Sequence, residues 1–387
     1  METLQHDVTV VGAGIAGLWS AKELIDQGLS VCVVERSGTL ANGATTKNEG
    51  WLHAGTYHAV AVEDEEEALR VTERTLYGHD AIVDFAPESI DHTKSFALFS
   101  EDHLVHKALY RWGKAGVISS ELSASQRANL EVRTAGVHTT FEVKDKSVNS
   151  VTLCQKLARY IIDSGGRILT GANFMPQTDT SADIVNSNGE RQMLRSNRFL
   201  LTSGAGIRLL HKELTGHELL MRYFKAHLLV APRLFRDNYF YMGSGEAGVM
   251  SHGKASIVGV NRDGIELSQP DYAITPSKEN LVRNAVLGMM PQGSLPHFEG
   301  QFTAIACCKP DIYTSHKDTQ SLNVQIFEAA PNYICALPGK MTEAPYLGRA
   351  AMLHVIGGYP DSPHHIPPYI TQDAIPLVTP RPMDYLI

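Results

Sequence analysis

The chain has 387 residues, of which 43% are hydrophobic and 20% are charged, and its formal net charge is −8 at pH 7. This composition is typical of a folded enzyme, and the negative charge argues against nucleic acid as a partner because phosphate binding needs a basic surface. No apolar run approaches the roughly 20 residues that span a bilayer, and the five cysteines show neither metal-ligand nor disulfide spacing. We therefore expect a cytoplasmic protein with no signal peptide, no transmembrane segment and no metal site.

The first thirty residues carry the strongest motif. A β-branched run at residues 7–11 leads into Gly12-Ala13-Gly14-Ile15-Ala16-Gly17 and then into an apolar helical pattern that ends at Gly28. This order predicts a dinucleotide-binding βαβ unit. Gly12 permits the tight turn, Gly14 lets a pyrophosphate approach the backbone, and Gly17 allows close packing of helix on strand. The amides of Ile15 and Ala16, at the positive end of the helix, complete the predicted phosphate site.

An acidic residue follows the second predicted strand, residues 30–34. Glu35 stands eighteen residues beyond the last glycine of the motif, where a carboxylate can accept hydrogen bonds from an adenosine ribose diol. The carboxylate disfavours NADP because it would repel the 2′-phosphate. The neighbouring Arg36 could bind that phosphate, so NADP is not fully excluded as a cofactor.

The loop after this strand is small and polar, as in loops that lie against a ligand. It runs from Asn42 through Thr45, Thr46, Asn48 and Gly50 to a segment that contains Leu52, His53 and His58. The acidic run 64–67 then opens a helix that we expect to reach about Gly78, with its acids at the positive end of the dipole.

The rest of the chain alternates between two patterns. Predicted strands at 94–99 and 139–143 and a helix at 103–114, joined by a polar connection over 120–132, form one region. A helix over 147–162 and strands at 167–169 and 198–202 return to α/β alternation, and Ala172 and Gly204 in the turns are further predicted cofactor-binding residues. Residues 225–326 have the period-two character of an antiparallel platform, with one helix at 277–287. A strand at 333–337 then turns through Gly339, Lys340, Met341 and Thr342 into a last helix that ends at 357–358, and the proline-rich remainder predicts an extended surface tail.

The fingerprint, the loop over 43–58 and the turn at 338–342 occur in one order that resembles the FAD-dependent D-amino acid oxidase-like superfamily. The stretch 48–55 is similar to a loop of L-2-hydroxyglutarate dehydrogenases, and the turn 339–342 is similar to the flavin turn of FAD-linked glycerol-3-phosphate dehydrogenases. The resemblance spans about residues 5–357. It implies FAD as cofactor and an α/β fold with a Rossmann-like FAD domain (1–92, 145–215 and 328–387). The same resemblance implies a discontinuous substrate domain (93–144 and 216–327) built on a mixed or antiparallel sheet.

Two segments depart from the pattern of this superfamily. Relatives often carry an arginine before a proline late in the substrate domain, where this chain has Cys308-Lys309-Pro310. Lys309 keeps the charge but lacks the bidentate fork of arginine. Phe224-Lys225-Ala226-His227 stands where relatives often have an arginine-glycine step. The resemblance therefore does not fix the substrate.

The resemblance assigns roles to several side chains. The turn 339–342 would face the pyrimidine edge of the flavin, where the following helix stabilises negative charge, and Lys340 would orient substrate or polarise dioxygen. Lys309, with Arg222, Lys225 or His227, would hold an anionic substrate group. An amine in its neutral form needs no strong base to give up a hydride, whereas an alcohol does, and His53 or His227 is the candidate base. Some relatives attach flavin covalently through a histidine at this place in the loop, so a covalent bond from His53 or His58 to the flavin is a further possibility.

The sequence thus predicts an FAD-dependent oxidoreductase that oxidises a small anionic amine or amino acid by hydride transfer to flavin N5. A second possibility is a 2-hydroxy acid or polyol-phosphate dehydrogenase, and the electron acceptor is either dioxygen or a quinone or other carrier. A flavin-binding redox sensor is the alternative of another class.

Overall fold

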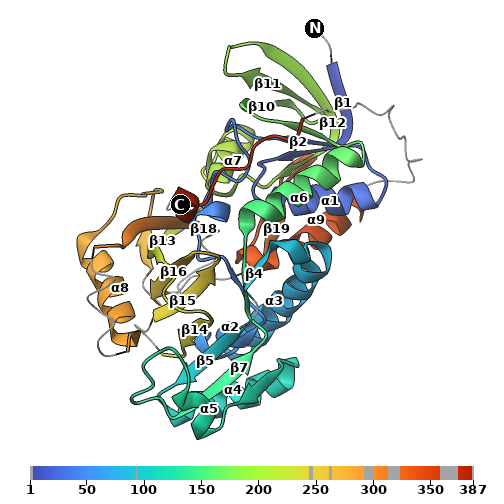
Figure 1. Ribbon diagram of the computed structural model, residues 1–387. Helices are drawn as coiled ribbons and strands as arrows, with labels where there is room; N and C mark the ends of the chain where they lie inside the picture. The colour runs from blue at the N-terminus through green and yellow to red at the C-terminus, as the bar shows by residue number, and fades with distance from the viewer. Residues whose placement is uncertain are drawn as a thin grey trace. The chain divides into compact units, whose positions relative to one another are not determined.

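The structure is a computed structural model that describes residues 3–92, 94–243, 247–260, 264–291, 300–312, 323–357 and 374–385 (Figure 1). The chain folds as two compact units, each made of separate segments. The first comprises Met1–Thr46, Val151–Tyr223 and Lys309–Thr379, and the second comprises Lys47–Ser150, Phe224–Cys308 and Pro380–Ile387. Residues 47–92, which the sequence analysis groups with the cofactor domain, cluster in the second unit.

The first unit alternates strands and helices. Its elements are β1 (Thr3–Val11), α1 (Ile15–Asp26), β2 (Val31–Val34), η1 (Ala44–Thr46), α6 (Ser150–Asp163), β9 (Arg167–Leu169), β10 (Ala172–Thr178), β11 (Ser181–Asn186), β12 (Arg191–Leu201), η3 (Gly204–Gly206), α7 (Ile207–Thr215), β19 (Gln325–Ala330), β20 (Tyr333–Leu337), η5 (Met341–Glu343) and α9 (Ala344–Gly357).

The sheet of the first unit has β1 at its centre. β1 pairs in parallel with β2 on one side and with β12 on the other, and β9 and β20 extend the parallel order β9-β2-β1-β12-β20. Because the chain leaves β1 in one direction for β2 and returns from the other side through β12, the carboxyl end of β1 is a topological switch point, where α/β sheets bind ligands. The predicted α/β fold is confirmed.

Two helices from opposite ends of the chain pack together on this sheet. α1 and α9 lie side by side (Figure 1), and a Cβ added at Gly348 of α9 would lie 2.9 Å from the Trp19 ring. Trp19 is buried, so the glycine lets the two helices approach closely. The helix that follows the glycine motif therefore packs against a helix that lies more than three hundred positions later in the chain.

The second unit contains most of the helical and antiparallel elements. They are β3 (Trp51–Leu52), α2 (Thr56–Ala61), α3 (Glu65–Phe85), η2 (Pro87–Ser89), β4 (Ile90–His92), β5 (Ser95–Phe99), α4 (Asp102–Ala115), β6 (Ser119–Glu121), α5 (Ala124–Ala128), β7 (Thr139–Val143), β8 (Lys146–Val148), β14 (Asn238–Tyr241), β15 (Ala247–His252), β16 (Ala255–Val260), β17 (Ile265–Leu267), α8 (Pro276–Met289) and η6 (Pro382–Tyr385). β13 (Met221–Pro232) and β18 (Thr303–Ile312) pair with each other and cross the boundary between the units.

These strands form a large mixed sheet and a small one. The large sheet has the order β17-β13-β16-β15-β14-β5-β7-β6, with β14 parallel to β5, and the small sheet has the order β3-β8-β4. α8 packs Val282, Val286 and Met289 into a core with Val249 and Val258 of the large sheet. The predicted antiparallel platform is therefore a mixed sheet that also includes β5–β7.

Three local predictions are corrected by the structure. α3 passes Gly78 and ends at Phe85, because its buried face continues through Gly78, His79 and Ile82. The predicted polar connection at 120–132 contains β6 and α5. The tail after residue 373 does not lie wholly on the surface, since Arg381 and Met383 are buried. Residues 358–373 lie outside the described residues. Among the described helices, none has the length and hydropathy to cross a bilayer.

A buried histidine on β1 predicts acid sensitivity of the first unit. Burial, with a smaller contribution from the charge of Arg167, lowers the pKa of His6 to about 4. The unfolded chain takes up a proton near pH 6.5 while the folded chain does not, so stability falls as the pH falls from about 6.5 to 4. We expect a loss of about 3 kcal/mol over this range. His6→Leu should flatten this part of the curve in thermal unfolding from pH 8 to 4.5.

The exposed His354 of α9 provides the control. His354→Leu should retain the acid-dependent loss, because it removes an exposed side chain and leaves the buried His6 in place. An unchanged pH dependence in His6→Leu would contradict this account of His6.

Candidate functional site

The glycine turn after β1 leaves no room for side chains. Gly12 has φ +107°, and a Cβ there would lie 2.8 Å from the Cα of Ser203. A Cβ at Gly17 would lie 1.9 Å from the Gly12 carbonyl oxygen and 2.6 Å from Thr202 Oγ1. The residue after the neighbouring strand β12 fixes this turn, because the Thr202 hydroxyl donates to the Val11 and Gly12 carbonyls. The structure thus brings Gly12, Gly17 and the end of β12 together.

The N-terminus of α1 has the features of an anion site. Gly14 is its N-cap and makes no side-chain capping bond, and the first turn contains no acidic residue. The Ile15 amide donates to Thr45 Oγ1 at 3.1 Å, while Ala16 lies buried in the same turn. Thr46 bonds the Ala41 carbonyl, and the Ala41 amide bonds the Ala13 carbonyl, so the loop 41–46 is fixed against the glycine turn.

Glu35 lies beside the same turn. Its two carboxylate oxygens accept the amides of Ala13 and Ser37, each at 2.8 Å, and its backbone oxygen accepts the Ala172 amide. A carboxylate has about four acceptor sites, so capacity remains for a ribose diol. Arg36 is exposed.

The residues of this cradle fit the adenosine diphosphate part of a dinucleotide. The Ser203 hydroxyl oxygen is buried and has no hydrogen-bond partner among the described residues, although it adjoins the glycine turn and Gly204. Backbone amides, two threonine hydroxyls and a half-buried carboxylate are the groups that bind pyrophosphate and ribose.

The later predicted residues of the first unit lie on β13, on β18 and after the end of β20. Lys340 has an extended backbone and precedes η5, Gly339, Lys340 and Met341 are half-buried, and Thr342 is buried. Lys309 is half-buried on β18. Arg222 is buried and its Nε lies 3.1 Å from Asp311 Oδ2, so its charge is already balanced inside the protein.

The predicted loop continues into the second unit. The Asn48 side chain accepts the Gly50 amide at 2.7 Å, and the Gly50 carbonyl accepts the Val148 amide at 2.8 Å. Leu52 is fully buried on β3. Gly50 has φ +65°, which a glycine adopts without strain.

His53 lies in a cluster of aromatic rings. Its ring centroid is 4.3 Å from that of Trp51 and 4.5 Å from that of His58, and Tyr57 and Phe240 pack on Trp51. His53 is 9% exposed.

A buried carboxylate holds this cluster. Asp145 accepts from Trp51 Nε1 at 2.9 Å and from the Thr56 hydroxyl, and its Oδ1 lies 3.9 Å from His53 Nδ1. Burial raises the pKa of Asp145, and the bonds from Thr56 and Trp51 oppose that rise. Asp145 therefore orients the segment that carries His53.

A second set of polar groups lies on one face of β13. Lys225 is 3% exposed, and its Nζ lies 2.6 Å from Asp271 Oδ2, whereas the Asp271 side chain is 48% exposed. This bond lowers the pKa of Asp271. His227 accepts the Thr275 amide at its Nε2, so a neutral ring carries its proton on Nδ1. Burial raises the pKa of Cys308, which also adjoins the Asp271 backbone.

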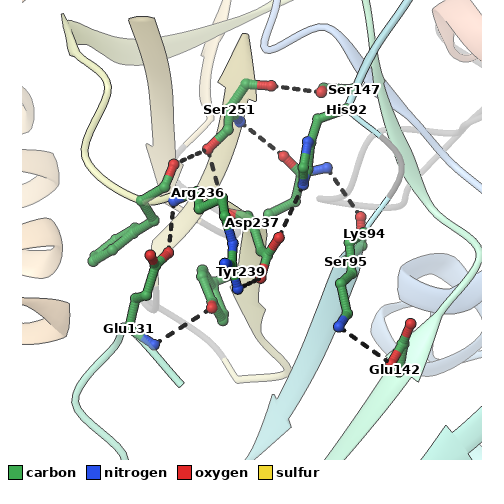
Figure 2. Close-up of polar contacts among 12 residues, drawn as sticks. His92, Lys94, Ser95, Glu131, Glu142, Ser147, Arg236, Asp237, Tyr239 and Ser251 are labelled. Atoms are coloured by element: carbon green, nitrogen blue, oxygen red, sulfur yellow. Dashed lines mark hydrogen bonds and ion pairs between the residues drawn. The ribbon is translucent and has the colours of Figure 1, made fainter. Parts of the chain in front are cut away.

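A third set links the small sheet to β15. His252 is buried, with Nδ1 2.8 Å from Asp91 Oδ2 and Nε2 2.8 Å from the Glu49 carbonyl. Figure 2 shows the polar contacts of the preceding residue: Ser251 donates to the Phe235 and Asp237 carbonyls, and its own carbonyl accepts the Ser147 hydroxyl. Asp237 also bonds His92 at 3.0 Å.

The structure therefore groups the predicted residues in two sets. Gly12, Gly14, Gly17, Glu35, Thr45 and Ala172 gather at one end of the first sheet, and Lys309 and Lys340 belong to the same unit. His53 and His227 belong to the second unit and have different neighbours.

The sequence analysis missed Asp145, Ser203, Asp271 and the His252–Asp91 pair. For Ser203 the glycine turn after a predicted strand was a usable signal. The others carry no local signal. Among the described residues, no group of three or more His, Cys, Asp or Glu is arranged to hold a metal ion.

Comparisons with known proteins agree with this geometry. The sequence profile of a family described as FAD dependent oxidoreductase matches residues 7–350. A Pseudomonas aeruginosa protein named "Probable FAD-dependent oxidoreductase" is 25% identical over 248 residues, which are 59% of this chain and 59% of that protein. The match thus spans less than two thirds of that relative.

Solved structures show the same fold at low sequence identity. The L-proline dehydrogenase of P. horikoshii superposes with a TM-score of 0.72 at 15% identity, over 94% of this chain and 96% of that one. The L-alpha-glycerophosphate oxidase of Mycoplasma pneumoniae, solved with FAD bound, has a TM-score of 0.69 at 16% identity, over 99% of this chain and 100% of that one.

Proposed function

The chain belongs to the FAD dependent oxidoreductase family, so it is an enzyme with FAD as its cofactor, and we propose that it oxidises a small anionic amine or amino acid. When bound, FAD supplies the two-electron acceptor for the substrate. The proposed cofactor contacts are the cradle of the first unit, the loop 45–53 and the turn 339–342.

The observation that carries this proposal is the buried cation on β13. Lys225 lies inside the protein, but its carboxylate partner, Asp271, is half exposed. A buried ammonium needs a counter-charge, and an exposed aspartate is one that a substrate carboxylate can replace. Lys225 would then hold the anionic group of the substrate.

The reacting carbon is proposed to carry an amine because a neutral amine gives up a hydride without a strong base. The alternative is an alcohol substrate, such as a 2-hydroxy acid or a polyol phosphate. His53 favours this alternative, since it lies 3.9 Å from the Asp145 carboxylate that would stabilise it after proton uptake. His227 is the weaker candidate base, because its Nε2 already accepts the Thr275 amide.

An anaerobic absorbance titration of the holoenzyme tests this function. Pools of D- and L-amino acids, N-methyl amino acids, 2-hydroxy acids and polyol phosphates are added in turn, and we expect an amine pool to bleach the flavin band. If only hydroxy acids or polyol phosphates bleach the flavin, the substrate is an alcohol and the amine proposal is wrong. Failure of every pool would refute a small anionic substrate. Admitting air after bleaching then separates dioxygen from a quinone or carrier as the acceptor.

Two substitutions on β13 and its neighbouring loop test how the anion is held. Lys225→Met should weaken the binding of the substrate that bleaches the flavin about tenfold or more. Asp271→Asn should strengthen the binding of this substrate about tenfold, because it removes the carboxylate that competes for Lys225. The exposed Lys254 of the same unit is the matched control, and Lys254→Met should bind as the natural chain does.

A further inference from the structure

A partly buried chain of charges connects the predicted cofactor loop to the C-terminal segment. His252 bonds the Glu49 carbonyl and Asp91, and Asp91 accepts from Arg381 Nη1 at 2.9 Å. Arg381 in turn bonds Asp384, and its side chain is only 9% exposed. All these residues belong to the second unit.

The hydrogen-bond geometry defines the protonation state of His252. The Glu49 carbonyl can only accept, and an ionised Asp91 can only accept. Burial opposes ionisation of Asp91, but the bonds from His252 and Arg381 outweigh it and lower the pKa of that carboxyl. Two acceptors, one at each ring nitrogen, can be satisfied together only by the imidazolium, because the neutral ring has a single N–H.

The backbone that His252 bonds is tightly packed. A Cβ at Gly50 would lie 2.6 Å from His252 Cε1, and Gly50 is held on its other side by Val148 and Asn48. The imidazolium is therefore a clamp on the backbone between Asn48 and Gly50.

We propose that His252, as an imidazolium held by Asp91 and Arg381, is a positioning residue that fixes the loop Asn48–Gly50 for FAD. This step rests on the proposed assignment of Asn48 and Gly50 to the cofactor. When His252 loses a proton, either the Glu49 carbonyl or the Asp91 carboxylate is left without its donor. The ring then loses its hydrogen bond to the loop or its hydrogen bond to Asp91.

The charges bonded within this network, those of Asp91 and Arg381, favour or oppose the protonated form of His252. Asp91 is the carboxylate on the ring, and Arg381 faces Asp91 from the other side. Among the described residues, the other charged or titratable groups on the neighbouring segments include Glu49, His92, Lys146, Asp237 and Asp384. Replacing Asp91 by asparagine removes the negative charge that favours the imidazolium, so the ring should give up its proton at lower pH.

Nitrogen-15 NMR of histidine-labelled holoenzyme tests the protonation state directly. The imidazole signal that is missing in His252→Gln should show both ring nitrogens protonated at pH 7. A neutral tautomer at pH 7 would overturn the proposal.

The visible spectrum of bound FAD and its retention on gel filtration, recorded from pH 6 to 10, test the positioning role. In the natural chain both should change at the pH at which the His252 signal loses its proton, with FAD held about tenfold more weakly above it. His252→Gln should resemble the high-pH state throughout, and Asp91→Asn should shift the change to lower pH. His92→Gln is the matched control, because His92 bonds Asp237 and should leave the transition in place.

A flavin spectrum and FAD retention that do not follow the His252 proton, or a transition that Asp91→Asn leaves at the same pH, would refute the proposal. Neither readout uses a substrate. If no substrate pool bleaches the flavin, the proposed function fails but the test of His252 still stands. If the enzyme is active but its flavin spectrum does not change with pH, only the proposed role of His252 fails.

Discussion

Gly17→Ala is expected to yield a protein that is purified without FAD. The added Cβ would lie 1.9 Å from the Gly12 carbonyl oxygen and 2.6 Å from Thr202 Oγ1, far inside van der Waals contact. The obstacle is backbone, so α1 must move away from the turn, and its N-terminal amides leave the phosphate position. We expect a loss of about 3 kcal/mol in unfolding stability together with the loss of the flavin absorbance band.

Gly38→Ala in the same unit is the control. A Cβ at Gly38 meets nothing within 4 Å, and its backbone is not left-handed. This variant should keep its flavin and its urea midpoint. A yellow Gly17→Ala protein with normal stability would contradict the close packing at the turn.

Asp145→Ala is expected to destabilise the second unit by about 4 kcal/mol. The substitution leaves the Trp51 N–H and the Thr56 hydroxyl buried without their acceptor, and each such group costs about 1–3 kcal/mol. The segment from Trp51 to His58 should loosen, so the near-ultraviolet circular dichroism of its aromatic rings should weaken as the urea midpoint falls.

Asp145→Asn separates the charge from the hydrogen bonds. The amide oxygen can still accept, so this variant should recover part of the stability, but His53 loses the adjacent carboxylate. Asp84→Ala, at an exposed position on α3, should change stability by no more than about 0.5 kcal/mol. Equal stability of Asp145→Ala and the natural chain would show that Asp145 does not hold the cluster.

The geometry of the proposed cofactor cradle could be predicted from sequence because the residues that form its turn are local. Gly12, Gly14 and Gly17 act through their own backbone, and Glu35 follows at a fixed spacing set by one helix and one strand. The strand at 333–337 and its turn into α9 were predicted for the same reason, since apolar period, glycine and proline mark them within a few residues.

Asp145 and the His252 clamp could not be predicted in this way. Asp145 stands between Lys144 and Lys146, a pattern typical of an exposed turn, yet it is buried and accepts hydrogen bonds from Trp51 and Thr56, which lie about ninety positions away. His252 meets Asp91 across 161 positions and Asp91 meets Arg381 across 290. No periodicity encodes such pairings, and the proline-rich tail gave no sign that Arg381 would be buried.

The central position of β1 also determines when the proposed cofactor site can form during synthesis. β1 is synthesised before its neighbour β12, which follows about 190 positions later, and β20 and α9 lie beyond residue 332. At about 5–20 residues per second the ribosome needs tens of seconds to supply them. Until then the β12 edge of β1 stays unpaired although β2 already pairs its other edge, and α1 lacks its contact with α9, so we expect nascent chains stalled before residue 333 to retain no FAD.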